Sequence, residues 1–265
     1  MAEAFLILLA GGILLAAAVS SPKQVTLNWL RLCGILALVM TAVGLFFYFT
    51  RESQPAELAP RMRRVQVGLL VTTVVCILAQ LALVQLDFRR AQRLFAAAGY
   101  VVAVLAGTNL LHEMMIPLGT AVKFPPKMWA MSMQAFAAAA IAALSGTALM
   151  DMLLGHAYLT ASKMTIAPFR RLNLVVAALL FLRFDLAAVA TFVMSRDVWQ
   201  RDGLFILTRW LVGILVPAVF IYMAHDCIKR RSTQAATGIL YVAGVLIFVG
   251  EIIALYLVRG TGLPF

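Results

Sequence analysis

Eight long apolar stretches alternate with short polar segments along the chain. Most of them reach the roughly 20 residues that an α-helix needs to cross about 30 Å of hydrocarbon. The stretches are Ala4–Val19, Trp29–Thr50, Val65–Leu86, Leu94–Leu118, Trp129–Ala157, Leu172–Ser195, Leu204–His225 and Gly238–Val258. Lipid cannot pair backbone polar groups, and a β-barrel would need alternating strands of about ten residues. The pattern therefore predicts an all-α, polytopic membrane bundle of about eight transmembrane helices, formed as a single domain over residues 1–265.

The composition agrees with lipid as the main solvent of this chain. Hydrophobic residues make up 63% of the sequence, charged residues 12%, and the mean hydropathy is +0.97. A soluble domain is typically about 25% charged, so water could not solvate this surface. The net charge is +11, but Lys and Arg gather at the ends of the apolar stretches, where they meet lipid headgroups. We therefore expect a lipid bilayer as the environment and no binding of nucleic acid.

The connections between the stretches are too short to hold a catalytic or nucleotide-binding domain. The longest is residues 51–64, and the sequence contains no P-loop, GxGxxG, HExxH or GxSxG motif. Cys33, Cys76 and Cys227 lie far apart, which disfavours thiolate metal sites, and we expect no metal. A self-contained enzyme is disfavoured, no catalytic residue is assigned, and other membrane or peripheral subunits are expected as partners.

The distribution of Lys and Arg gives only a weak signal about orientation. We define side A as the membrane side that carries the first, third, fifth and seventh connections, and side B as the other. Basic residues divide almost evenly between the two sides. No Lys or Arg precedes the first stretch, however, and Lys23 follows it, which favours side A as cytoplasmic. We expect a bacterial cytoplasmic (inner) membrane protein with both termini on the outer, periplasmic side.

Ionisable residues inside the stretches are the main candidates for function, since such residues usually face a bundle interior, a cavity or a partner. The helical rise of about 1.5 Å per residue gives their depth. One group lies toward side B and comprises His112, Glu113, Arg209 and Glu251. An acid, a base and a histidine at one level could hold a quinone headgroup or form a proton entry point. The alternative is a structural network in which Arg209 neutralises Glu251 or Glu113.

A second pair, Arg183 and Asp185, lies near the middle of the sixth stretch. Two residues apart on a helix, the side chains point to nearly opposite sides, so they cannot pair well with each other. Each is expected to find a partner on a neighbouring helix or in an assembly. Either a buried ion pair or a step in a proton relay would explain this pair.

A third group, Asp151, His156 and His225, lies toward side A. His156 and His225 share a depth, so a haem b held by both is one hypothesis, and two interfacial amphipathic anchors is the other. The sequence has three histidines, which excludes a dihaem site with four histidine ligands.

Two further patterns concern helix packing. Small residues crowd the fifth stretch, including Ala137–Ala140, Ser145 and Gly146, and predict a close contact with another helix or subunit. Pro117 and Pro217 interrupt the fourth and seventh stretches and are expected to kink them beside the polar levels.

Eight helices, short connections and no redox motif resemble, in span count, the quinone-interacting membrane anchors of the NrfD or DmsC type. The leading hypothesis is an integral membrane subunit of a respiratory-type electron-transport complex that interacts with a quinone or a haem and conducts protons. The alternatives are a small proton-coupled secondary transporter or channel, and a non-catalytic scaffold or assembly subunit.

Overall fold

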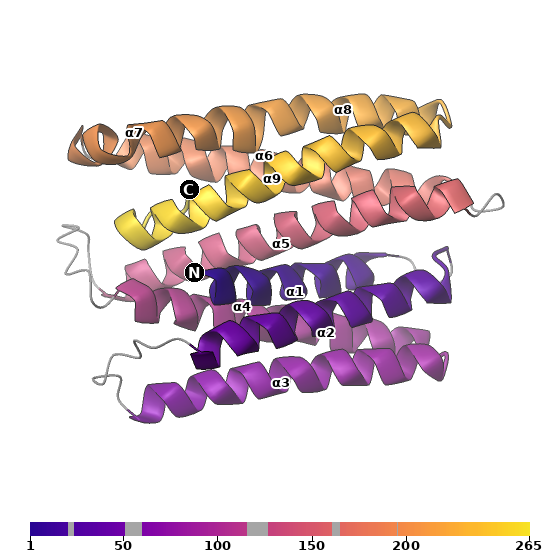
Figure 1. The fold of residues 1–265 in the computed structure, drawn as a ribbon, viewed down its shortest axis with the longest axis horizontal. Helices are drawn as coiled ribbons and strands as arrows, with labels where there is room; N and C mark the ends of the chain where they lie inside the picture. Colours follow the sequence, from indigo (N-terminus) through magenta and orange to yellow (C-terminus); the bar gives the residue numbers. More distant parts are fainter. Residues whose placement is uncertain (21–23, 51–59, 116–126, 161–164, 195) are drawn as a thin grey trace.

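The chain is a bundle of long helices that run along one common direction (Figure 1). The computed structural model describes residues 1–20, 24–50, 60–115, 127–160, 165–194 and 196–265, and these contain no strand. The elements are α1 (Ala2–Val19), α2 (Leu27–Thr50), α3 (Pro60–Gln85), α4 (Arg89–Met115), α5 (Lys127–Thr160), α6 (Ala167–Val193), α7 (Arg196–Trp210), the π-helical turn η2 (Leu211–Leu215), α8 (Val216–Lys229) and α9 (Thr233–Thr261).

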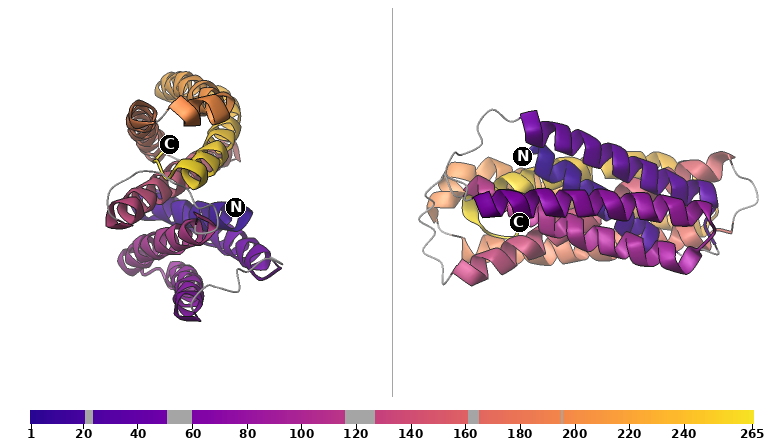
Figure 2. Two further views of the ribbon diagram at one scale, coloured as in Figure 1. Left: turned by 90° about the vertical axis from the view of Figure 1, so that its left-hand side faces the viewer. Right: turned by 90° about the horizontal axis from the view of Figure 1, so that it is seen from below.

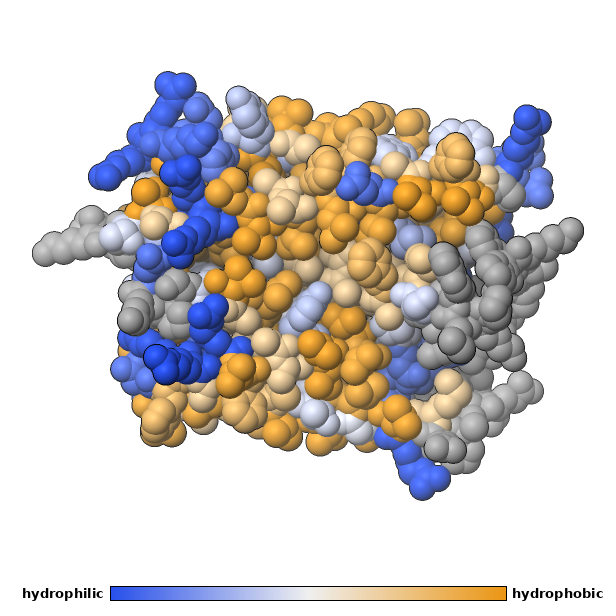
Figure 3. Space-filling view, turned by 180° about the vertical axis from the view of Figure 1, so that it is seen from behind, coloured by the Kyte–Doolittle hydropathy of each residue, from blue (hydrophilic) through white to orange (hydrophobic). Residues whose placement is uncertain are grey.

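The described residues form eight helices that are long and apolar enough to cross a membrane, with α7, η2 and α8 acting as one span. In Figure 3, apolar side chains cover the middle of the visible face and hydrophilic ones gather at its two ends. Large apolar side chains are exposed near the middle of their helices, as Phe181 is on α6 and Val101 on α4. The predictions of an all-α membrane bundle and of eight spans are confirmed.

Helix α5 lies between two groups of helices, as the view along the bundle shows (Figure 2). It contacts α1 and α4 on one side and α6 and α9 on the other. In the first group, α1 packs against α2, α4 and α5, which explains why most of its residues are buried. Both termini lie toward the same end of the bundle, as an even number of spans requires (Figure 1).

The small residues of α5 allow a very close contact with α1. A methyl group on Gly146 would overlap the backbone of Gly12, and one on Gly12 would overlap the carbonyl of Ala142. Backbones approach this closely only where side chains are small. The packing surface predicted for the fifth stretch is therefore an internal one, used by α1.

The seventh span is irregular at the position where Pro217 was expected to disturb it. The irregularity is η2, in which the N–H of Val216 donates to the carbonyl of Leu211. Pro217 has no N–H of its own to donate to the preceding turn. Single π-helical turns of this kind are often found at functional sites. Pro117 lies outside the described residues.

Candidate functional site

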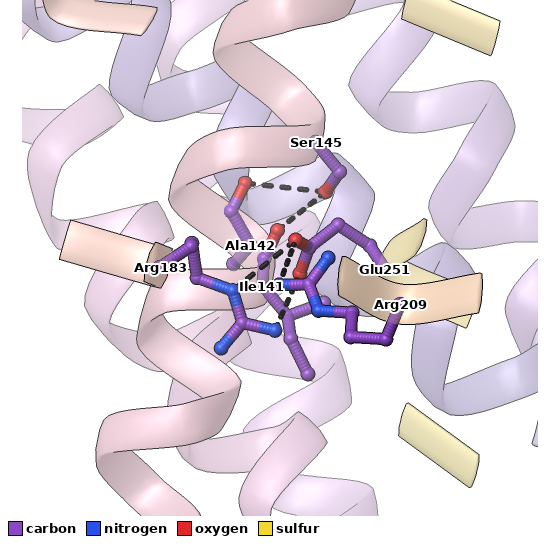
Figure 4. Close-up of polar contacts among 6 residues, drawn as sticks. All are labelled: Ile141, Ala142, Ser145, Arg183, Arg209 and Glu251. Carbon is purple, nitrogen blue, oxygen red and sulfur yellow. Dashed lines mark hydrogen bonds and ion pairs between the residues drawn. The ribbon is translucent and has the colours of Figure 1, made fainter. Parts of the chain in front are cut away.

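Three charged side chains from three helices meet in the interior of the bundle (Figure 4). They are Arg183 of α6, Arg209 of α7 and Glu251 of α9, and each is 0% exposed. The Arg183 Nη2 atom lies 2.9 Å from Glu251 Oε2, and its Nε donates to Oε1 at 3.1 Å. The Arg209 Nη2 atom lies 2.9 Å from Glu251 Oε1. One carboxylate thus joins two guanidinium groups; we call this cluster the arginine–glutamate triad.

The triad lies deep in the membrane. Its members are about 15–20 Å along their helices from the ends on side B, judged from the helical rise. The ion pair between Arg209 and Glu251 agrees with the alternative in which Arg209 neutralises Glu251. Arg183, which the sequence indicated at a separate level, belongs to the same cluster.

The triad carries more positive than negative charge. Among the described atoms, Arg183 Nη1 and Arg209 Nε and Nη1 have no hydrogen-bond partner. Charged groups buried in this way are costly unless they are paired, and removing one partner of a buried pair typically costs about 3–5 kcal/mol. Because both arginines pair with the same carboxylate, loss of Glu251 would leave two buried positive charges without a counter-charge.

Two glycines provide the space for Arg209. A methyl group on Gly250 would lie 2.9 Å from Arg209 Nη1 and would also overlap Gly213. A methyl group on Gly213 would lie 2.6 Å from the Cα of Gly250 and 3.0 Å from the same Nη1 atom. The crossing of η2 and α9 thus requires glycine on both helices, and it seats the guanidinium between them.

Helix α5 forms the wall beside the triad (Figure 4). The hydroxyl of Ser145 on this helix donates to the carbonyl of Ile141 at 2.6 Å. Because the hydroxyl is satisfied within its own helix, α5 presents a largely apolar surface to the three charged groups.

A second polar network joins α5, α6 and α8 near side A. The Asn173 Nδ2 group donates to Asp151 Oδ2 at 3.1 Å, and Asn173 Oδ1 lies 3.1 Å from His225 Nδ1. Asp151 and Asn173 are fully buried, His225 is half-buried, and Asp151 Oδ1 has no hydrogen-bond partner within the described ranges. We call this chain of three residues the histidine relay.

The relay descends into the membrane. His225, Asn173 and Asp151 lie about 6, 9 and 13 Å along their helices from the ends on side A. Because the amide nitrogen of Asn173 donates to Asp151, the amide oxygen of Asn173 is the acceptor for His225. The imidazole of His225 therefore carries a hydrogen on Nδ1. The Nε2 atom of His225 is then the ring nitrogen left for another molecule.

His225 also lines a groove between α6 and the helix formed by η2 and α8. The groove has a volume of about 320 Å³. Apart from His225 its lining is almost wholly apolar or aromatic, and it includes Leu174, Phe181, Phe184, Ile214 and Tyr222. Phe181 and Phe184 stack with ring centroids 6.4 Å apart, and both are exposed. The groove therefore opens to the lipid-facing surface and has one polar end.

The remaining candidates of the side B level belong to another network. Glu113 of α4 is buried and lies 3.4 Å from Asn109 Nδ2, which donates to Gln66 of α3 at 2.7 Å. His112 is half-buried on the same helix. Glu113 thus joins α4 to α3, whereas Arg209 and Glu251 join α7 to α9. The expectation that the four residues toward side B form one site is corrected. They have a similar depth, but they lie in different directions around the bundle.

The two histidines near side A engage different helices. His156 is exposed, and its Nδ1 lies 3.4 Å from the hydroxyl of Tyr241 on α9. His225 contacts Asn173 on α6. Ligation of a haem b by both stays a prediction.

Asp185 is exposed on the outer face of α6. Together with the burial of Arg183, this confirms that the two side chains point to opposite sides of the helix. Of the two, Arg183 alone has a partner among the residues that the structure describes.

Sequence reasoning missed the amide residues that connect the acids. Asn173 bridges Asp151 and His225, and Asn109 with Gln66 connects Glu113 to α3. A search restricted to ionisable residues overlooks these, although an uncharged amide within an apolar stretch is itself a signal, because it needs hydrogen-bond partners in lipid.

Comparison with known proteins leaves the site to be interpreted from its chemistry. No protein-family model, curated protein or solved structure matches this chain.

Proposed function

We propose that the chain is a membrane subunit of an electron-transport complex and binds a quinone in the groove between α6 and α8. The observation that carries this proposal is the position of His225, which both lines an apolar groove and begins a hydrogen-bonded relay into the protein. A quinone combines a polar headgroup that exchanges protons with a long apolar tail. The groove offers a complementary surface for each part.

The shape of the groove supports this ligand class. Ligand pockets are commonly apolar, with a few placed polar groups, and begin at about 300 Å³. Here the volume is about 320 Å³, and aromatic side chains line the apolar part. Because the groove opens toward lipid, a ligand dissolved in the bilayer would enter sideways, with its tail along Phe181 and Phe184 and its headgroup at His225.

The relay supplies the proton chemistry of the proposal. Reduction of a quinone to a quinol takes up two electrons and two protons. His225 in its doubly protonated form, with Nδ1–H bonded to Asn173, would donate the proton on Nε2 to a quinone oxygen and would be reprotonated from side A to supply the second proton. Asn173 and Asp151 would orient the ring and connect it to the interior. The electrons would come from a redox centre of a partner subunit, since the chain has no motif for its own.

Orientation gives this chemistry a direction. With side A as cytoplasmic, in a bacterial inner membrane and with both termini periplasmic, His225 would take its proton from the cytoplasm.

Subunit mass spectrometry and a visible spectrum of the complex, purified in gentle detergent, would test for partner subunits, haem and quinone together.

The binding proposal has a direct test. The purified chain would be labelled with a photoreactive quinone carrying an azido group on its headgroup. We expect labelled peptides from α6 and α8, and at least a tenfold loss of affinity in His225→Ala. His156→Ala is the matched control, since His156 lies toward the same side but does not line the groove. Equal loss in both variants, or labels elsewhere, would contradict the proposal.

A proton-coupled transporter is the second candidate, and the arginine–glutamate triad favours it. Transporter sites lie near the membrane midplane at irregular helices, and the triad adjoins η2. Flux through proteoliposomes that contain this chain alone, lost in folded Glu251→Gln protein, would favour the transporter over the subunit.

A further inference from the structure

The outer face of α6 carries a carboxylate in apolar surroundings. Asp185 is exposed, and no hydrogen bond or ion pair joins it to any residue that the structure describes. One turn away on each side lie Phe181, 67% exposed, and Val189, 58% exposed. Phe192, 92% exposed, lies two turns away toward side B. We call Phe181, Asp185, Val189 and Phe192 the α6 outer face.

Asp185 is too deep for water or lipid headgroups to solvate it. It lies about 12 Å along α6 from the end on side B, and the side chains between them are apolar except for Thr191, whose hydroxyl donates to the carbonyl of Ala187. Unlike Lys or Arg, Asp has a short side chain that cannot extend to the membrane surface. Acyl chains have no hydrogen-bond donors, so the carboxylate needs a partner at this depth.

We propose that the α6 outer face docks a transmembrane helix of a different protein, which carries an Arg or Lys at the depth of Asp185. Ionisable groups within a membrane usually pair with one another, and here only the negative member is present. This inference rests on Asp185 and does not depend on the identity of the groove's ligand, although Phe181 borders both surfaces.

A second copy of this chain does not meet the requirement. The exposed Arg and Lys side chains that the structure describes all lie in the first two or last two turns of their helices, as Arg31, Arg64, Arg93 and Arg201 do, or in the connection between α8 and α9. The two described arginines at depth, Arg183 and Arg209, are buried and paired with Glu251. A homodimer across α6 would bring two carboxylates together without a cation.

The chemistry of the surface can be tested with a synthetic partner. A leucine–alanine transmembrane peptide with a single central Arg would be incorporated with the purified protein into phosphatidylcholine vesicles. Energy transfer from the peptide to the protein measures association. We expect half-saturation at a peptide-to-lipid ratio at least tenfold lower than for the same peptide with Leu in place of Arg.

Two variants give this test its controls. Asp185→Asn should abolish the preference for the Arg peptide, and since its side chain points outward, the variant should fold. Asp226→Asn should retain the preference, because Asp226 is an exposed acid at the end of α8, already paired with Arg230. Equal association of the Arg and Leu peptides with wild-type protein, or a preference that survives Asp185→Asn, would overturn the proposal.

The natural partner can be identified in membranes of the native host. A photo-crosslinking residue at Val189 should capture a peptide from an apolar span of another protein, with Arg or Lys at matching depth, and Asp185→Asn should lower that yield at least tenfold. The same residue at Val75, exposed on α3, is the positional control. Capture of a second copy, of lipid alone, or of a span without a cation would overturn the proposal.

Discussion

Arg183 and Asp185 lie two residues apart on α6 and meet opposite environments. Arg183 is fully buried against Glu251, and Asp185 faces outward. Helical periodicity predicts that they diverge, and this is confirmed. Which of the two would find its partner within the chain was not predictable, because that depends on the rotation of α6 about its own axis.

The triad predicts an unequal response to the loss of its members. Glu251→Gln leaves two buried guanidinium groups without a counter-charge, whereas Arg209→Met leaves Arg183 paired with Glu251. We expect Glu251→Gln to lower the free energy of unfolding by about 3–5 kcal/mol and Arg209→Met by clearly less. Thermal unfolding of the detergent-solubilised variants measures both. Equal losses of unfolding free energy in the two variants would contradict this prediction.

The histidine relay predicts that Asn173 acts through its amide. Asn173→Leu removes the bridge between Asp151 and His225 while keeping a similar volume. We expect a loss of quinone affinity of about tenfold, equivalent to about 1.4 kcal/mol, because His225 loses the group that orients it. Titration with a quinone analogue checks this. Unchanged affinity would mean that the groove holds its ligand without the relay.

At the scale of the elements, the apolar pattern located every span but not its full length. The seventh stretch, Leu204–His225, lies within a helical span of Arg196–Lys229. Its polar first turns are attached to α9 through Asp202, which is buried and accepts a hydrogen bond from the hydroxyl of Tyr256 at 3.4 Å. Hydropathy reports contact with lipid, so it does not detect helical turns held by a neighbouring helix. Pro217 signalled an irregularity, but its π-helical form was not predictable.

The crossing of η2 and α9 predicts contrasting effects of the same substitution at two positions of α9. In Gly250→Ala the new methyl group meets Gly213 and Arg209, and we expect a loss of about 1–3 kcal/mol in unfolding free energy. In Gly238→Ala the methyl group meets nothing within 4 Å, and a gain of up to about 1 kcal/mol is expected. Thermal unfolding of both variants compares them, and a tolerated Gly250→Ala would contradict the close crossing.

At the scale of the whole molecule, the sequence gives the depth of each polar residue but not its direction around the bundle. Depth alone grouped His112 and Glu113 with Arg209 and Glu251, whereas the fold assigns Glu113 to α3 and α4 and Glu251 to α6, α7 and α9. The central position of α5 between the two groups of helices produces this separation (Figure 2). Such angular information arises only from tertiary packing.

The bundle also predicts a labelling pattern. In a Cys227→Ala background, cysteines at Ser232, between α8 and α9, and at Leu263, after α9, lie at opposite ends. In right-side-out vesicles, whose periplasmic face is outside, an impermeant maleimide should label position 263 and not position 232. Labelling of 232 alone would reverse the orientation, and labelling of both would contradict the eight-span topology.

The π-helical turn has a consequence for how the two polar sites are held in relation to each other. One extra residue in a turn shifts the angular phase of everything that follows by about 100°. Removing one residue from Leu211–Leu215 would restore a regular helix, but α8 would then rotate as a unit. Arg209 could keep its place, while the imidazole of His225 would swing away from Asn173. The number of residues in this turn thus fixes the rotation of α8 relative to α7. The segment should therefore not tolerate an insertion or a deletion, even next to its exposed residues Leu211 and Leu215.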